Sequence, residues 1–314
     1  MTQMPLITVP LVSIVIPTFH RTDKLSVLLA DLAMQIPEDG SVDVVVVDND
    51  QDGSAQAVMP DVPWLHYLIE PSSGVATARN TGVQSARGRY ILFIDDDQRP
   101  SADWLAQMLA HAKAGHPVCF GPVAAVYDVV PPAPLRRALD PMFSRSLSDP
   151  SGAEISAKRA YMGTGNAMFD RQACFQDAVF ETQFNGGGED VWLLRHLAED
   201  LALPFIWVAE AGVGEHVPDD RCRVDFVLRR KRLDGTLRCV VESGGAGPKK
   251  WARLAMWMGV GAAQVGLHGL GLIWSGLRRN DAGLYHRAQM ATGIGKLIWW
   301  THPFVWAPKQ RARA

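Results

Sequence analysis

Three adjacent carboxylates, Asp95, Asp96 and Asp97, directly follow the apolar stretch 91–94. Like charges at this spacing repel one another, so a buried strand should not end in such a cluster unless something offsets the charge. Mg²⁺ and Mn²⁺ can do so, because they prefer oxygen ligands and are often held by one or two carboxylates plus substrate phosphates. The alternative is a solvated acidic turn. The cluster makes a divalent cation the first candidate cofactor.

The elements before the aspartates bring other polar residues beside them. Residues 11–19 and 42–50 contain β-branched apolar runs typical of strands buried on both faces. Residues 21–35 and 74–88 are expected to be helices. Strand–helix–strand order implies right-handed crossovers and a parallel α/β sheet, in which ligands bind beyond the carboxyl ends of the strands. The polar residues expected at this edge, with the aspartates, are Thr18, Arg21, Asp48 and Asn49.

A second pair of acids, Glu189 and Asp190, follows three glycines and opens a predicted helix. Glycines let the backbone pass close to a ligand, and a reaction at a hydroxyl group needs a general base within hydrogen-bond reach. Acids in the first turn of a helix are also ordinary capping residues. The sequence pattern by itself leaves both interpretations open.

The composition limits the class of protein. The chain has 314 residues, a formal net charge of −2 and 47% hydrophobic residues, enough for a large core and without indication of nucleic-acid binding. Its four cysteines have no CxxC spacing, so we expect reduced thiols and no zinc site. The N-terminal segment has neither a basic n-region nor a small-residue cleavage site, and we interpret it as the lead-in to the first strand.

The composition changes near residue 245. Residues 254–274 contain no charged residue, and their length is sufficient to span a bilayer. Glycines, Gln264 and His268 make the run only moderately apolar, so we expect in-plane amphipathic helices on a membrane surface, with residues 293–306 as a second contact. A true span and a soluble dimer interface are the alternatives. The basic residues that flank the run are Lys249, Lys250, Arg253, Arg278 and Arg279.

Six motifs in order resemble those of family 2 glycosyltransferases. They are SIVIPTFHR, VVVVDND, GVATARNTG, FIDDDQRPSADWL, GTGNAMFDR and GGGEDVWLLRHL, within residues 11–240. The resemblance implies a GT-A fold, a Rossmann-like, mostly parallel sheet flanked by helices, over residues 1–245. The donor half would be about 11–120 and the acceptor half about 121–240, with 246–314 as the membrane-associating region. VVDNDQDGSA and EAGVGEHVP are most similar to enzymes of bacterial exopolysaccharide assembly.

The resemblance also implies roles for individual residues. Those facing the nucleotide and donor sugar would be Pro17, Thr18, Phe19, Arg21, Asp48, Asn49, Gly74, Arg79, Asn80, Asp95, Asp96 and Arg230. The metal ligands would be Asp95, Asp97 and His216, with Asp97 the first candidate. Asp190 would be the general base and Glu189 its acceptor-site partner. The acceptor contacts would be Gly163, Gly165, Asn166 and Trp192.

Structural alternatives exist for several of these residues. The segment 163–166 could be a glycine-rich turn before a strand, and Trp192 could pack in the core. A single histidine such as His216 is more often a hydrogen-bonded structural residue. The basic segment 221–232, which contains Arg230, could be a solvated helix face, a clamp for the diphosphate or a contact for anionic lipid.

Taken together, the resemblance implies a metal-dependent, inverting enzyme. It would move a sugar from a nucleotide diphosphate donor, with UDP-sugars expected first, to a lipid-linked saccharide at the cytoplasmic face of the bacterial inner membrane. The pathway would be exopolysaccharide or related glycan assembly, and an oligomer is compatible with the sequence. The alternatives are a nucleotidyltransferase, although the first strand lacks a glycine-rich phosphate loop, and a catalytically silent sugar-binding scaffold subunit.

Overall fold

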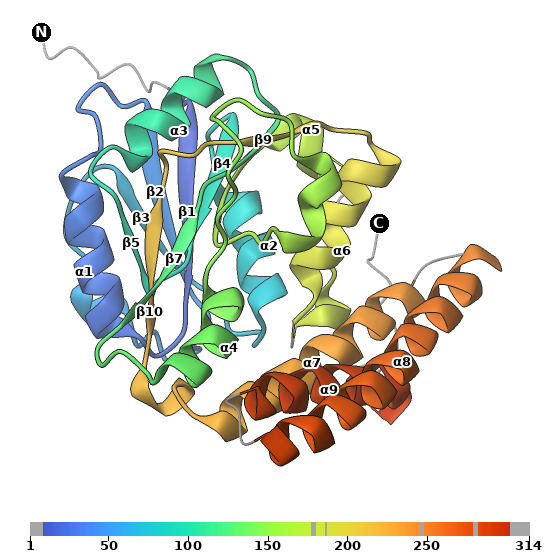
Figure 1. Cartoon of the computed structure of the whole chain (residues 1–314). Coiled ribbons are helices and arrows are strands. Elements are labelled where there is room, and N and C mark those ends of the chain that lie inside the picture. The colour runs from blue at the N-terminus through green and yellow to red at the C-terminus, as the bar shows by residue number, and fades with distance from the viewer. Residues whose placement is uncertain (1–8, 177–179, 186, 245–247, 279–281, 302–314) are drawn as a thin grey trace, which may run out of the picture. The chain divides into compact units, whose positions relative to one another are not determined.

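The predicted strands belong to one seven-stranded sheet with the order β3-β2-β1-β4-β8-β6-β9 (Figure 1). The computed structural model describes residues 9–176, 180–185, 187–244, 248–278 and 282–301. β8 pairs antiparallel with β4 and β6, whereas the remaining pairs are parallel, so every strand except β8 runs in one direction. The strands are β1 (Val12–Thr18), β2 (Val42–Asp48), β3 (Leu65–Ile69), β4 (Tyr90–Ile94), β6 (Val118–Phe120), β8 (Asn166–Asp170) and β9 (Phe205–Trp207).

Helices cover both faces of this sheet. The leucines of α1 (Thr22–Ala33) and the apolar side chains of α3 (Trp104–Lys113) pack in one core cluster with residues from β1, β2 and β4. On the other face, α2 (Val75–Ser85), α5 (Arg171–Phe175) and α6 (Glu189–Arg195) contribute to a second cluster. The valines of β2 point alternately into these two clusters, which is why an uninterrupted apolar run forms this strand.

The reversed direction of β8 matters for the site. Ile94, the last residue of β4, pairs with Asn166, the first residue of β8. The glycine-rich segment that precedes β8 therefore meets the same sheet edge as the carboxyl ends of β1, β2 and β4. A second sheet has the order β5-β10-β7, and β5 (Gln98–Pro100) pairs antiparallel with β10 (Val213–Val217) close to the aspartates; β7 covers Val123–Tyr127.

The chain divides into two compact units. The described residues up to Ala124, together with Arg145–Glu215, form the first unit, and Ala125–Ser144 with the described residues from His216 onward form the second. This division differs from the predicted boundary at residue 245, which falls inside the second unit. The reason is that α7 (Val224–Ser243) packs against α9 (Gly283–Leu297): Gly235 meets the Thr292 carbonyl so closely that no Cβ would fit.

The second unit is helical. Leu139 and Phe143 of α4 (Ala133–Phe143) share a small core cluster with Val227 of α7 and Ala288 of α9. The long helix α8 (Pro248–Arg278) packs along α9. Among the described residues, it is the one helix long and apolar enough to cross a membrane by length and composition. Arg279 and the last part of the predicted second contact, residues 302–306, lie outside the described residues.

Candidate active site

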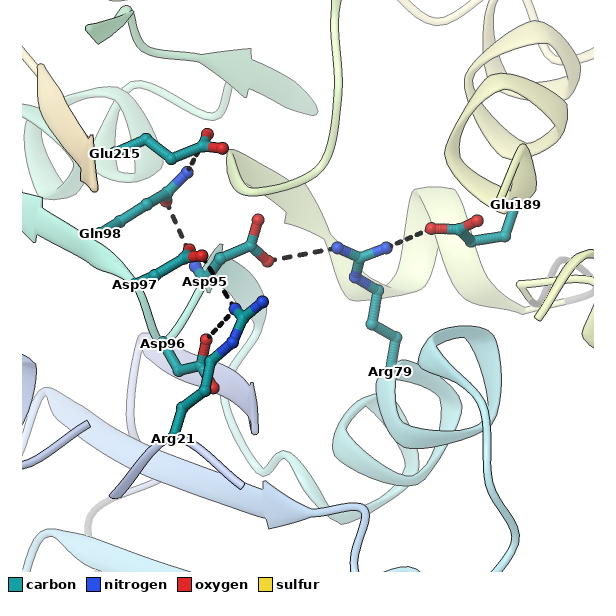
Figure 2. A network of polar contacts seen from close by, with 8 residues as sticks. All are labelled: Arg21, Arg79, Asp95, Asp96, Asp97, Gln98, Glu189 and Glu215. Atoms are coloured by element: carbon teal, nitrogen blue, oxygen red, sulfur yellow. Dashed lines mark hydrogen bonds and ion pairs between the residues drawn. The ribbon is translucent and has the colours of Figure 1, made fainter. Parts of the chain in front are cut away.

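The aspartates after β4 are held by Thr18, at the end of β1, and by Arg21, which follows this strand. Asp96 is buried and accepts hydrogen bonds from Thr18 Oγ1 at 2.7 Å and from Arg21 Nη1 at 2.8 Å. The same Arg21 nitrogen lies 2.8 Å from Oδ2 of Asp97 (Figure 2). Burial raises the pKa of Asp96 to about 6 although the Arg21 charge opposes the rise. The predicted meeting of these strand ends is thus present in the structure.

Asp95 contacts a different arginine, Arg79. Arg79 Nη2 lies 3.2 Å from Asp95 Oδ1, and Arg79 Nη1 lies 2.6 Å from Glu189 Oε1. Arg79 is 6% exposed; burial opposes its charge, but Asp95 and Glu189 outweigh this and raise the pKa of Arg79. Figure 2 shows the guanidinium between the two carboxylates. The sequence predicted a donor contact for Arg79 and missed this bridge.

Glu189 opens α6 from a buried position. The chain enters the helix through Gly188, whose φ of 96° is a left-handed conformation that favours glycine. Burial, followed by the charge of Asp190, raises the pKa of Glu189, while Arg79 lowers it. Oε2 of Glu189 is buried without a hydrogen-bond partner among the described residues. It is therefore a buried polar atom whose hydrogen-bonding capacity the described protein atoms do not satisfy.

Gly163 and Gly165 lie against both acidic groups. A Cβ at Gly165 would overlap with Oδ2 of Asp95, so this position has no room for a side chain. A Cβ at Gly163 would lie 3.3 Å from Oδ2 of Asp190 and 3.1 Å from Arg145 Nη1. The segment before β8 therefore connects the aspartates of the strand edge with the acids of α6.

Glu215 is a carboxylate of this edge that the sequence did not single out. It pairs with Gln98 across β10 and β5, and Gln98 Nε2 lies 3.4 Å from its Oε2 (Figure 2). Burial raises the pKa of Glu215 to about 7; Arg145 opposes this, while Asp95 and Asp97 add to it. Its position next to the aspartates depends on strand pairing, which the sequence spacing did not reveal.

The side chains of Asp48 and Asn49 form hydrogen bonds within the protein. The fully buried Asp48 carboxylate accepts hydrogen bonds from Ala55 N at 2.7 Å and from Tyr67 Oη at 2.8 Å. Asn49 donates to the Glu70 and Ser72 carbonyls and accepts from Gly74 N at 2.7 Å. These contacts shape the loop that leads into α2, where Gly74 has a φ of 137°. A contact of either side chain with a base stays a prediction.

Three other residues that were predicted to contact a ligand form contacts within the protein. Asn166 is 1% exposed; its Oδ1 accepts from Trp104 Nε1 at 2.9 Å and its Nδ2 donates to the carbonyls of Pro122 and Ala211. A contact of Asn166 with the acceptor stays a prediction. Asn80 is bonded at both ends of its amide to the backbone of Phe180. Trp192 packs between Phe184 and the Arg195 guanidinium.

The remaining predicted residues are less constrained. Phe19 is 53% exposed beyond β1, and Pro17 is half-buried within that strand. His216 and Arg230 belong to the second unit. There, His216 Nε2 lies 2.9 Å from Asp128 Oδ2, and Arg230 Nε lies 3.1 Å from Asp234 Oδ1 one turn along α7. Metal ligation by His216 and donor contact by Arg230 stay predictions.

The donor set at the strand edge fits a divalent cation. Asp95 and Asp97 present carboxylate oxygens, and both lie near enough to Glu215 to add to the rise in its pKa that burial causes. Hard cations such as Mg²⁺ and Mn²⁺ prefer this all-oxygen environment. Asp95 and Asp97 are the residues best placed to hold such an ion.

The family model for glycosyl transferase family 2 matches residues 13–175. Succinoglycan biosynthesis protein ExoM of Rhizobium meliloti is 29% identical over 231 residues, which are 69% of this chain and 71% of ExoM. Glycosyltransferase AglE of Haloferax volcanii is 33% identical over 205 residues, 63% of this chain and 65% of AglE.

Among solved structures, the mannosyltransferase PcManGT of Pyrobaculum calidifontis has the same fold. The TM-score is 0.58 at 19% identity, over 93% of this chain and 88% of PcManGT. That structure contains GDP-Man and Mn²⁺. The family match and this structural similarity confirm the expected fold. The chain therefore belongs to glycosyl transferase family 2, has the GT-A fold, and is similar to glycosyltransferases of exopolysaccharide biosynthesis.

Proposed function

We propose that this chain is a metal-dependent, inverting hexosyltransferase. It moves a sugar from a nucleotide diphosphate donor, with UDP-sugars first, to a lipid-linked saccharide in exopolysaccharide or related surface-glycan assembly. The observation that carries the proposal is the Arg79 bridge, because it links Asp95 at the strand edge with Glu189 beside Asp190. One buried side chain thereby joins the carboxylates that would act on the donor to those that would act on the acceptor.

The donor side of the proposal rests on the strand edge. Arg21 and Thr18 hold Asp96 and Asp97 in place from the end of β1. A divalent cation bound by Asp95 and Asp97 would offset the charge of the leaving diphosphate. The GDP-Man and Mn²⁺ of the PcManGT structure support a metal-bound nucleotide sugar as the donor class.

The acceptor side rests on α6 and the glycine segment. Asp190 is half-buried at the start of α6, and glycine at position 163 keeps a side chain away from its Oδ2. Asp190 would take the proton of the acceptor hydroxyl, and Glu189, held by Arg79, would be its acceptor-site partner. The activated oxygen would then attack the anomeric carbon opposite the departing diphosphate. A single displacement of this kind inverts the anomeric configuration.

The lipid-linked acceptor is supported by the surface of α8, which exposes many large apolar side chains. Those that share one face are spaced three, four or seven residues apart: Met256, Val260, Leu267, Leu270, Trp274 and Leu277. The face toward α9 carries Gln264, which bonds Gln289 and Lys296, and His268, which bonds His286. A helix at a water-exposed surface normally carries polar residues on its outer face. A membrane surface would cover this exposed face.

The location that follows is the cytoplasmic face of the inner membrane, with α8 in the plane of the lipid. Lys250 and Arg253 at the start of α8 suit the anionic lipids of a cytoplasmic leaflet. The ExoM relationship supports a role in the assembly of a cell-surface polysaccharide. Nucleotide sugars are cytoplasmic, so donor and lipid-linked acceptor would meet at this surface.

The test is a donor screen on the full-length protein. UDP-, GDP-, dTDP- and CMP-sugars are incubated with and without Mn²⁺ or Mg²⁺, and release of the nucleotide is measured. The proposal expects one donor class to be hydrolysed slowly, in a metal-dependent manner that is lost in Asp97→Asn. Asp190→Asn should retain metal-dependent nucleotide binding but lose transfer by about 10²–10⁴-fold. A folded protein without metal-dependent nucleotide binding would leave the scaffold alternative ahead.

A further inference from the structure

A second group of metal-ligating side chains lies away from the active site. His111 is in the last turn of α3, His116 follows in the connection to β6, and Cys119 is the central residue of β6. Their ligand atoms all lie within 4.8 Å of one another. In the part of the chain that the structure describes, no other group of three or more histidine, cysteine or acidic residues meets this criterion.

The two histidines face each other through the same ring atom. Nδ1 of His111 lies 2.9 Å from Nδ1 of His116, so in the absence of a cation one of the two nitrogens must carry a hydrogen. Neutral imidazoles with converging lone pairs are what a metal ion requires.

Cys119 adds a sulfur ligand beneath the histidines. The residue is fully buried, where a thiolate without a neighbouring cation would be costly. Tyr90, a member of the same core cluster, has a buried hydroxyl without a hydrogen-bond partner among the described residues. Polar groups in this part of the core are thus not satisfied by the described protein atoms.

We propose that His111, His116 and Cys119 form a zinc site. Two imidazoles and one thiolate are typical ligands of Zn²⁺, and ligand atoms that all lie within 4.8 Å of one another need to shift by only about an ångström for tetrahedral coordination. Both histidines are partly exposed, so water would take the fourth position. The expectation that the chain has no zinc site rested on the absence of CxxC spacing, and that spacing says nothing about ligands from a helix, a turn and a strand.

Zinc binding at this site has a defined proton balance. The Cys119 thiol loses its proton to form the Zn–S bond. The hydrogen between the two Nδ1 atoms moves to Nε2 of its own ring, so each Nδ1 can ligate and neither imidazole loses net charge. One proton is therefore released for each Zn²⁺ bound, which makes the affinity fall at low pH.

The site differs from the donor site in position and role. His116 precedes β6, which runs parallel to β4, so it lies at the sheet edge opposite to Asp95 and Asp97. The zinc ion would fasten the end of α3 to β6, and thereby to the sheet. Its contribution would be to stability, because none of its ligands belongs to the active site.

The experiment is a titration of chelator-treated, full-length protein with Co²⁺ and with Zn²⁺. Co²⁺ reports the site directly, because a cysteine ligand produces a thiolate-to-cobalt charge-transfer band. We expect one equivalent with this band, displacement by Zn²⁺, and one proton released per ion. The band should disappear in Cys119→Ser, and His116→Gln should weaken Co²⁺ binding by at least about tenfold.

Matched variants make the outcome decisive. Cys174→Ser replaces another buried cysteine and should keep the band. Asp97→Asn removes the proposed donor-site ligand and should also keep it, which separates this proposal from the proposed enzyme function. If Cys119→Ser fails to fold, Co²⁺ binding by His116→Gln decides the result, because position 116 is only half-buried. Folded wild-type protein without the band at saturating Co²⁺, or His116→Gln with unchanged affinity, would overturn the zinc site.

Discussion

Arg79 and Glu189 form a buried ion pair, 2.6 Å from Nη1 to Oε1, across 110 residues of sequence. Both side chains are 7% exposed. The other terminal nitrogen of Arg79 contacts Asp95, so the charge of one guanidinium is shared between two parts of the site. A change at Arg79 should therefore affect donor and acceptor chemistry together.

Arg79→Lys is the first prediction. Lysine keeps the positive charge, but its single ammonium cannot replace the planar fork that reaches both Asp95 and Glu189. We expect sugar transfer to fall by about 10²-fold, because displaced catalytic groups cost about this much. Steady-state transfer kinetics measure the effect. Arg87→Lys is the control: Arg87 pairs with Asp43 but is itself half-exposed, so this variant should keep its transfer activity. Equal transfer rates for the two variants would contradict the bridge.

Gly165→Ala tests the contact between the glycine segment and Asp95. The added methyl would overlap with Asp95 Oδ2 and push the carboxylate out of position. Forcing a methyl group into packed surroundings costs ~1–3 kcal/mol, or about tenfold and more in affinity. Mn²⁺-dependent nucleotide binding, measured by calorimetry, should weaken accordingly. Gly212→Ala has ordinary van der Waals room and should bind like wild type.

Glu189→Gln should change how stability depends on pH. Burial and Asp190 raise the folded-state pKa of Glu189 to about 7, above its unfolded value. The folded state then holds the proton of Glu189 more tightly than the unfolded chain does. The stabilisation that this proton provides is complete below about pH 4.5 and is lost as the pH rises through 7. Glutamine does not titrate. The free energy of unfolding of Glu189→Gln, relative to wild type, should rise by on the order of 2 kcal/mol from pH 5 to pH 8.

Urea titrations at the two pH values measure this change. Glu199→Gln, at an exposed position in the helical turn that follows α6, is the matched control. A Glu189→Gln variant whose stability runs parallel to that of wild type across the range would mean that Glu189 titrates normally.

Leu267→Asn combined with Leu270→Asn tests the apolar face of α8. These side chains are 69% and 68% exposed, so the fold should tolerate the change. Removing two leucines from a membrane contact should weaken binding to vesicles with anionic lipid by about tenfold or more. Co-sedimentation measures it. Met34→Asn, at an 86% exposed position in the first unit, is the control; unchanged vesicle binding of the leucine double variant would exclude this face.

The sheet was predictable where the sequence is most apolar. β1, β2 and β4 are buried on both faces and stand out as uninterrupted apolar runs. β3 was not predicted, because it is half-buried and His66 interrupts its apolar pattern. The predicted tail helix was also found, as α8, although the unit to which it belongs begins much earlier in the chain.

Local motifs named the residues of the candidate site, but not the contacts between them. Local motifs pointed to the aspartates and to Glu189 with Asp190. The partner of Arg79 lies 110 residues away, and Glu215 reaches the edge only through the pairing of β10 with β5. Asn166 lies in a glycine-rich motif, yet the indole of Trp104 occupies its side chain. Such outcomes depend on tertiary packing, which no local pattern encodes.

The antiparallel strand β8 has a consequence for modularity. It comes from the half of the chain expected to serve the acceptor, yet it completes the backbone pairing of β4, whose end carries the aspartates. A fragment that ends near residue 120 would leave β4 with an open edge and its core side chains uncovered. The two halves therefore cannot be exchanged between relatives by a cut at that point. A chimera that alters sugar choice would have to carry residues 166–170 along with the donor half.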